Sequence, residues 1–121
     1  APHAILALSV FCADEEAEAT RMASSMLLAF AQLRAGRAGR MPSPEEALSY
    51  RFSAEEEAGI APFRRLQITG TPEVVRRGIE RMAELTFADE VMLATHAHDP
   101  QARIRSYTLI AQAFGMSESA P

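Results

Sequence analysis

The sequence predicts an α/β fold in which three strand-and-helix units alternate around a parallel sheet. Three apolar runs of strand length recur along the 121 residues, and each is followed by an amphipathic stretch that opens with a helix-starting signal. Strands that alternate with helices pair in parallel through right-handed crossovers. A chain of this length has room for one domain, which we place at residues 1–116, followed by a flexible tail at residues 117–121.

The composition indicates a folded protein and excludes several kinds of chemistry. Apolar residues make up 48% of the chain and the formal net charge is −4, so no electrostatic footprint for nucleic acid is present. All 12 basic residues are arginines, which excludes Schiff-base and Walker lysine chemistry. The single Cys12 excludes an internal disulfide and fits a reducing compartment. No run reaches the length of a membrane span, and we therefore expect a cytoplasmic protein with neither nucleic-acid nor membrane partners.

The first unit occupies residues 3–36. Residues 3–12 form a nearly continuous apolar run, the pattern of a strand covered on both faces. Asp14 is placed to cap the following helix, which runs for about six turns and stops at Gly36. Its apolar side chains recur at helical spacing and are expected to pack against the sheet: Ala19, Met22, Ala23, Met26, Phe30 and Leu33.

An insert at residues 37–65 separates the first unit from the second. Glycines and prolines punctuate it, Pro62 among them, and two capping boxes open short helices, Ser43 with Glu46 and Ser53 with Glu56. Connections of this length are uncommon in compact domains. The pattern fits either a lid over a binding site or an inert insertion, and it favours neither.

The second unit turns sharply from strand to helix at residues 66–75. Gly70 can adopt a backbone conformation that other residues avoid, Thr71 can accept a hydrogen bond from the first helical turn, and Pro72 suits the first helical position. This turn is either an anion site for a phosphate or carboxylate, or only a well-started helix. The helix runs to Leu85, with four apolar residues facing inward: Val75, Ile79, Met82 and Leu85.

The third unit comprises a strand at residues 89–95 and a helix capped by Asp99 that ends at Gly115. His96 and His98 lie just beyond the strand, where they can bind a metal or line a ligand mouth. A catalytic zinc site needs three protein ligands, and the sequence offers only His3 and carboxylates placed mostly on helices. We therefore expect no metal site. Cys12 ends an apolar strand and is expected to be a buried, unreactive thiol.

Several stretches, taken in order, resemble the luciferase-like flavin-dependent monooxygenases. These are residues 2–17, residues 68–75 (Ile-Thr-Gly-Thr-Pro-Glu-Val-Val), residues 88–95, and Asp99 with residues 103–111. The resemblance covers nearly the whole chain but corresponds to the C-terminal portion of those enzymes. Their fold is a TIM-type barrel of eight units and typically ~250 residues, of which this chain supplies about three units.

The resemblance implies a function for the full-length enzyme, which oxidises an organic substrate with oxygen and reduced flavin, usually FMN. It places Gly70 and Thr71 near the phosphate end of the flavin and makes the insert the lid segment of luciferases. Because earlier strands build much of the flavin pocket, this chain alone is expected to bind no flavin and to be inactive. The catalytic residues, the substrate and the reductase partner are not indicated.

Two interpretations of the chain remain. In the first it is the C-terminal fragment of a flavin monooxygenase and needs the missing N-terminal barrel portion; a start at Ala1 directly before a strand, without Met, favours this. In the second it is a stand-alone, non-catalytic module that acts through self-association or a partner chain. In both, three strands leave open sheet edges and an apolar face, so we expect a homo-oligomer that buries them.

Overall fold

The computed structural model describes residues 3–37 and 39–116; the predicted tail at residues 117–121 lies outside this part of the chain. The elements follow the predicted alternation, which confirms the α/β class. In chain order they are β1 (Ile5–Cys12), α1 (Glu16–Arg34), α2 (Pro44–Ser49), α3 (Ala54–Arg65), β2 (Gln67–Gly70), α4 (Pro72–Thr86), β3 (Glu90–Ala94) and α5 (Pro100–Ala113). None of the helices in residues 3–37 and 39–116 combines the length and the apolar character needed to cross a bilayer.

The three strands form one parallel sheet in the order β2-β1-β3. The second half of β1 pairs with β2, with Val10 opposite Ile68, and the first half pairs with β3, with Ala7 opposite Met92. The first strand of the chain is therefore the central one. In a regular barrel made of successive βα units, neighbouring strands follow one another in chain order. Here β1 and β3 are neighbours, and the short β2 lies on the opposite edge of β1.

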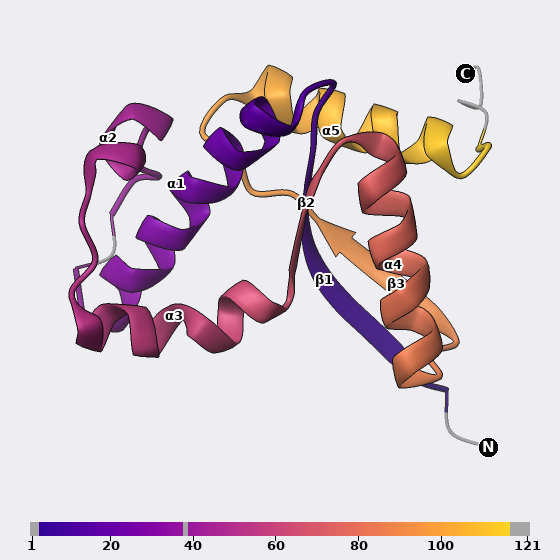
Figure 1. Ribbon diagram of the computed structural model, residues 1–121, viewed down its shortest axis with the longest axis horizontal. Helices are drawn as coiled ribbons and strands as arrows, with labels where there is room; N and C mark the ends of the chain where they lie inside the picture. The colour runs from indigo at the N-terminus through magenta and orange to yellow at the C-terminus, as the bar shows by residue number, and fades with distance from the viewer. Residues whose placement is uncertain (1–2, 38, 117–121) are drawn as a thin grey trace.

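Helices α4 and α5 cover one face of the sheet (Figure 1). Every second residue of β1 points to this face, so Leu8, Val10 and Cys12 are buried there. They form the main core with residues of the two helices: Val75, Ile79, Leu109 and Ile110. Gly78 permits the close approach of α4 to β2, because a Cβ at this position would lie 2.9 Å from Cγ2 of Ile68.

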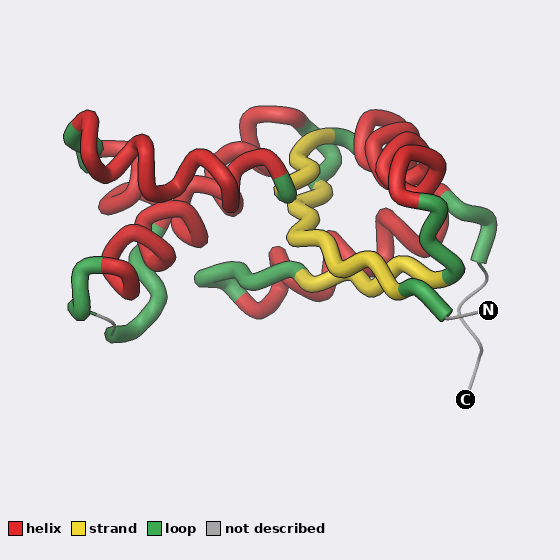
Figure 2. The backbone as a smooth tube through the Cα atoms, turned by 90° about the horizontal axis from the view of Figure 1, so that it is seen from below, coloured by secondary structure: helices red, strands yellow, loops and turns green. Residues whose placement is uncertain are grey.

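Helix α1 covers the opposite face near the carboxyl end of β1, and the insert packs against its outer side (Figures 1 and 2). Phe11 and Ala13 are buried with the first turns of α1, at Ala19, Met22 and Ala23. Further along α1, Leu27 and Ala31 pack against Ile60 of α3. Phe30 and Phe63 stack there, with ring centroids 4.5 Å apart. The two ends of α1 thus join the sheet to the insert.

The first half of β1 is covered on one face only. Ile5 is 55% exposed and Met92 of β3 is 60% exposed, and the register places both on the face opposite α4 and α5. The prediction of a strand covered on both faces is therefore correct for the second half of β1 and wrong for the first half. The reason is geometric, because α1 reaches only as far as Phe11.

The predicted helix boundaries need small corrections. Asp14 does not cap α1; the N-cap is Glu15, which makes no side-chain cap bond. The Asp14 carboxylate instead accepts hydrogen bonds from Arg105 of α5, at 3.0 and 3.3 Å. Helix α1 has 19 residues, about five turns, because it ends at Arg34. Leu33 and Leu85, both expected to face inward, are 60% and 65% exposed, since each lies in the last turn of its helix beyond the packed surface.

The insert contains the two expected short helices. At α3 the capping box is complete, with Ser53 accepting from the Glu56 amide and Glu56 accepting from the Ser53 amide. At α2 the Ser43 hydroxyl accepts from the Glu46 amide, and the hydroxyl also bonds the Glu46 carboxylate. Pro62 lies inside α3 instead of interrupting it.

Side chains complete the edge of β1 where β3 stops. Thr95 follows β3, and its hydroxyl donates to the Val10 carbonyl at 2.7 Å. The Ser106 hydroxyl of α5 accepts from the Cys12 amide at 3.0 Å and lies 3.3 Å from the Thr95 hydroxyl. The Tyr107 hydroxyl accepts from the Thr95 amide at 2.8 Å. These bonds take the place of strand pairing and fix α5 to the carboxyl end of β1.

Candidate functional site

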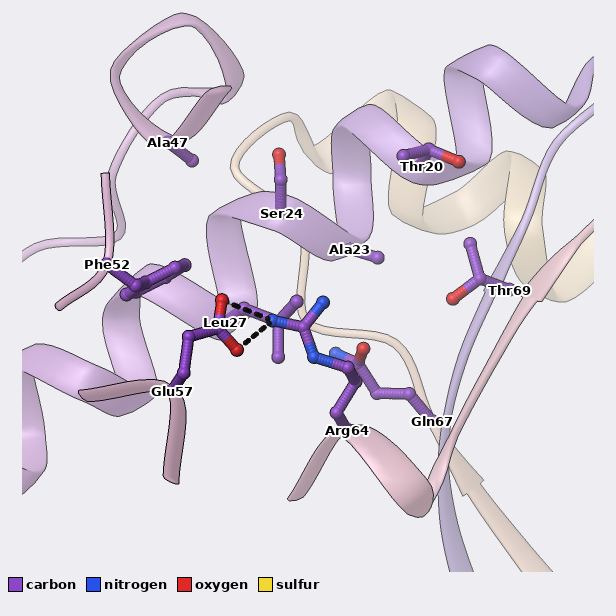
Figure 3. Close-up of a pocket in the computed structure, with 10 residues that line it drawn as sticks. All are labelled: Thr20, Ala23, Ser24, Leu27, Ala47, Phe52, Glu57, Arg64, Gln67 and Thr69. Carbon is purple, nitrogen blue, oxygen red and sulfur yellow. Dashed lines mark hydrogen bonds and ion pairs between the residues drawn. The ribbon is translucent and has the colours of Figure 1, made fainter. Parts of the chain in front are cut away.

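A cavity of about 550 Å³ lies between α1, the insert and β2 (Figure 3). Its size falls in the range of small-molecule sites. Ten residues line it, from four elements and the loop between α2 and α3: Thr20, Ala23, Ser24, Leu27, Ala47, Phe52, Glu57, Arg64, Gln67 and Thr69. We name this the insert cavity, because the insert supplies four of its lining residues.

The insert cavity has an apolar wall. Ala23 and Leu27 of α1 and Ala47 of α2 are buried, and Phe52 comes from the loop that follows α2. The Phe52 ring is held by an edge-to-face contact with Tyr50, with centroids 5.2 Å apart. Tyr50 is fixed in turn, since its hydroxyl donates to Glu56 at 2.7 Å. The wall therefore presents a positioned aromatic ring to the cavity.

Charged and polar groups lie opposite this wall. Arg64 pairs with Glu57 at 3.2 Å, and both side chains are about half exposed (Figure 3). Gln67 and Thr69 reach the cavity from β2, on the face that carries Ser9 and Phe11 of β1. The side-chain nitrogen of Gln67 is enclosed and has no hydrogen-bond partner within the described residues.

The predicted site residues Gly70 and Thr71 adjoin the insert cavity without lining it. Gly70 has φ +155°, and a Cβ there would lie 2.9 Å from Cγ1 of Val74, so the position requires glycine. Thr71 is the N-cap of α4, but its side chain makes no cap bond, and the predicted hydrogen bond is wrong. Pro72 does occupy the first turn, as predicted. The first-turn amides are thus not taken up by Thr71.

The two histidines beyond β3 lie in different places. His96 lines a small cavity with Met26, Phe30 and Met41, whereas His98 lines another with Glu18 and Glu45. Within residues 3–37 and 39–116, no group of three or more histidine, cysteine or carboxylate side chains is arranged to hold a metal ion. A ligand mouth shared by both imidazoles does not form.

Cys12 is fully buried in the main core, where its backbone is held by Ser106. Burial raises the pKa of its thiol to about 11; Asp14 adds to the shift and Arg105 opposes it. A thiol with this pKa is protonated at neutral pH and is a poor nucleophile. This agrees with the prediction of an unreactive thiol.

The insert cavity was not anticipated from the sequence. Its strand residues did carry a signal, because Gln67 and Thr69 alternate with Leu66 and Ile68, the pattern of a strand with one polar face. The ion pair between Glu57 and Arg64 gave no signal in the sequence. The two residues are seven positions apart, and each looks like an ordinary charged residue on a helix surface.

Two known proteins are similar to this chain over most of its length. No protein-family model matches the chain. A luciferase-like monooxygenase of Escherichia coli K12 is 31% identical over 108 residues, which is 89% of this chain and 32% of that protein. The uncharacterized protein YwcH of Bacillus subtilis is 32% identical over 117 residues, which is 93% of this chain and 34% of that protein. The chain thus spans about a third of the length of the curated relatives it matches.

A solved structure is similar over nearly the whole chain. The crystal structure of apo-MsnO8 superimposes with a TM-score of 0.75 and 26% sequence identity. The match covers 97% of this chain and 36% of that one. The architecture described above therefore recurs as about a third of a larger protein.

Proposed function

The chain belongs to the luciferase-like monooxygenase family, and from this we propose that it is the C-terminal third of a flavin-dependent monooxygenase. In the whole enzyme, reduced flavin supplies the electrons with which oxygen oxidises an organic substrate. This chain contributes the last strands of a TIM-type barrel and the insert that flanks the substrate, and it is inactive alone. We place the enzyme in the cytoplasm, because a chain with a single cysteine forms no internal disulfide and is compatible with a reducing compartment.

The observation that carries the proposal is the similarity to a luciferase-like monooxygenase over 89% of this chain. The architecture supports the same function. The half-covered face of β1 and β3, with Ile5 and Met92 exposed, is an apolar sheet face on the side opposite α4 and α5, where further strands of a barrel could meet it. The remaining two thirds of a polypeptide of the relatives' length would supply the strands that meet it.

The glycine turn and the uncapped amides at the start of α4 favour the phosphate end of a flavin, whereas the nearby side-chain charges do not. Gly70 gives the tight turn before α4, and the first-turn amides beyond Thr71 are free of a side-chain cap, as a phosphate requires. Glu73 in the same turn opposes an anion, and Arg76 is engaged with the Ala113 carbonyl at 2.8 Å. Gly70 and Thr71 are therefore proposed as contacts to the phosphate end of FMN, and the rest of the site comes from outside this chain.

The first experiment compares the natural gene product with this chain. The intact mass of the protein from its native cells is measured, and both forms are titrated into FMN and assayed for oxygen uptake with reduced FMN. We expect a product about three times heavier that binds FMN and consumes oxygen, whereas the 121-residue chain leaves FMN fluorescence unchanged. A longer product that fails to bind flavin, or strong quenching by this chain alone, contradicts the proposal.

The phosphate contact has its own test in the longer product. Thr71→Asp places a good helix cap and a negative charge at the proposed contact, so α4 keeps its stability while FMN binds about tenfold more weakly. The control Thr86→Asp adds the same charge at the other end of α4. Equal FMN affinity of the two variants would remove Thr71 from the flavin site.

The exposed apolar face supports a second candidate function. Ile5 is 55% exposed and Met92 is 60% exposed on one face of the sheet. We propose as the alternative a non-catalytic module that buries this face against a second copy of itself. Light scattering decides between monomer and dimer. A 13 kDa species whose helicity is unchanged on dilution contradicts the module.

A further inference from the structure

Helix α2 covers one side of the insert cavity, and few contacts hold it there. It lies beside α1 (Figure 1), where Ala47 lines the cavity and is the one buried residue of α2. By contrast, α3 is anchored by the fully buried Ile60 and by Phe63, whose ring stacks on Phe30. A helix of six residues is not stable in water by itself. The position of α2 therefore depends on its contacts with the rest of the chain.

An ion pair joins the first turn of α2 to α1. The Arg21 guanidinium donates to the Glu45 carboxylate at 2.6 Å, and it also lies 3.9 Å from Glu18 of its own helix. Hydrogen bonds from its own backbone amide and from Arg21 hold the pKa of Glu45 below its usual value. This carboxylate therefore stays charged over the range of pH in which imidazole gains or loses its proton.

His98 lies beside this ion pair. A cavity of about 230 Å³ separates the start of α1, the start of α2 and the loop before α5. Eight residues line it: Glu18, Arg21, Met22, Pro44, Glu45, His98, Asp99 and Ala102. Apart from the imidazole, its charged groups are three carboxylates and one guanidinium, and one of the carboxylates, Asp99, accepts from the Gln101 amide at the start of α5. A protonated His98 supplies the second positive charge among these carboxylates.

From this arrangement we propose that protonation of His98 holds α2 against α1 over the insert cavity, and that the neutral imidazole lets α2 open more often. Histidine is the side chain whose charge ordinarily changes between pH 5 and 8, so the device responds to pH near neutrality. The inference goes beyond the proposed function, because it concerns the opening of α2 and involves no flavin.

The test is hydrogen exchange of backbone amides in the 121-residue chain at pH 6 and pH 8, expressed as protection relative to the unfolded chain. The reporters are the amides of Glu46, Ala47 and Tyr50, which are hydrogen-bonded within the α2 segment. The reference is the Glu57 amide, which bonds to the Ser53 carbonyl at the start of α3.

The positive imidazolium favours the closed position, so protection of α2 should fall as pH rises. We expect the reporter amides to be about twofold more protected at pH 6 than at pH 8, the size of effect that an exposed charge pair supplies. The reference amide should show no such difference. Equal protection of α2 at both pH values overturns the proposal.

Histidine variants identify the group that titrates. His98→Gln removes the imidazole and should abolish the twofold difference. The matched control is His3→Gln, since His3 also faces two carboxylates, Asp89 at 4.0 Å and Glu90 at 3.3 Å, but lies before β1. This variant should keep the difference, and so should His96→Gln, because His96 lines a different cavity. A difference that survives in His98→Gln, or that is lost in His96→Gln, overturns the proposal.

A carboxylate variant tests the partner on α2. Glu45→Gln removes the charge that faces Arg21 and should lower the protection of α2 about two- to fivefold at pH 8. Glu46→Gln removes an equal charge from the same first turn and is the matched control. Equal protection in the two variants overturns the proposal. These measurements involve neither flavin nor oxygen, so they succeed or fail independently of the proposed monooxygenase.

Discussion

At the scale of single residues, Phe87 occupies a backbone conformation that disfavours its side chain. It is the C-cap of α4 with φ 53° and ψ 36°, in the left-handed region, and its ring is 88% exposed. Glycine has no Cβ to strain at such a position. We predict that Phe87→Gly is about 1 kcal/mol more stable toward urea than Phe87→Ala.

The alanine variant is the matched comparison, because it also removes the ring but keeps a Cβ. A glycine variant that unfolds at a lower urea concentration than the alanine variant would show that the ring or the cap contributes contacts the strain argument omits.

Cys12 gives a second prediction at this scale. Burial raises the pKa of its thiol from 9.0 to about 11, so only about one thiol in a thousand is ionised at pH 8. The Cβ resonance of Cys12 should therefore titrate in the folded chain with a midpoint near 11, a readout that needs no reagent to reach the buried sulfur. Because the thiol ionises more readily in the unfolded chain, stability should fall as pH rises from 9 toward 11. A titration midpoint unchanged by unfolding in urea would contradict this assignment.

At the scale of elements, the hydroxyl of Ser106 completes the edge of β1 at Cys12. Ser106→Ala leaves the buried Cys12 amide without an acceptor, and we predict a loss of about 1–3 kcal/mol in unfolding free energy. Thr95→Val should interact with it, since the two hydroxyls lie 3.3 Å apart, and a double-mutant cycle measures the coupling.

The control for this prediction is Thr86→Ala. The Thr86 hydroxyl is exposed and bonds only to carbonyls of its own helix, so the change should lie within about 0.5 kcal/mol. An equal loss in both variants would mean that the serine contributes to the helix and not to the strand edge.

The helices and strands were largely predictable from the sequence. Which strands pair with each other, and which side chains bond across the fold, were not. The boundaries of α4 and α5 followed from Pro72, Pro100 and Asp99, which are local signals. The strand order and the Asp14 to Arg105 pair depend on residues 58 or more positions apart, such as Ser9 opposite Gln67 and Ile5 opposite Glu90. Local signals contain no information on such pairing. For the same reason the sequence predicted the polar face of β2, which is a local pattern. It did not predict that the insert packs over this face, because that contact joins distant parts of the chain.

At the scale of the whole molecule, the face that carries Ile5 and Met92 decides how the chain associates. If a second copy covers it, Met92→Lys places a charge in the contact and should convert a dimer to a monomer. The helical content should be unchanged, because Met92 is 60% exposed within the chain. Light scattering and circular dichroism of this variant, beside Leu85→Lys on the opposite side of the core, check both statements.

The central position of β1 has a consequence for synthesis. β1 is complete at Cys12, but its partner β3 begins only at Glu90. At about 5–20 residues per second, ribosomes need roughly 4–16 s to add the residues between them. During that interval the edge of β1 that later pairs with β3 has no partner. An unpaired edge of an apolar strand is a site where chains aggregate, so the yield of folded protein should depend on how fast the chain is made.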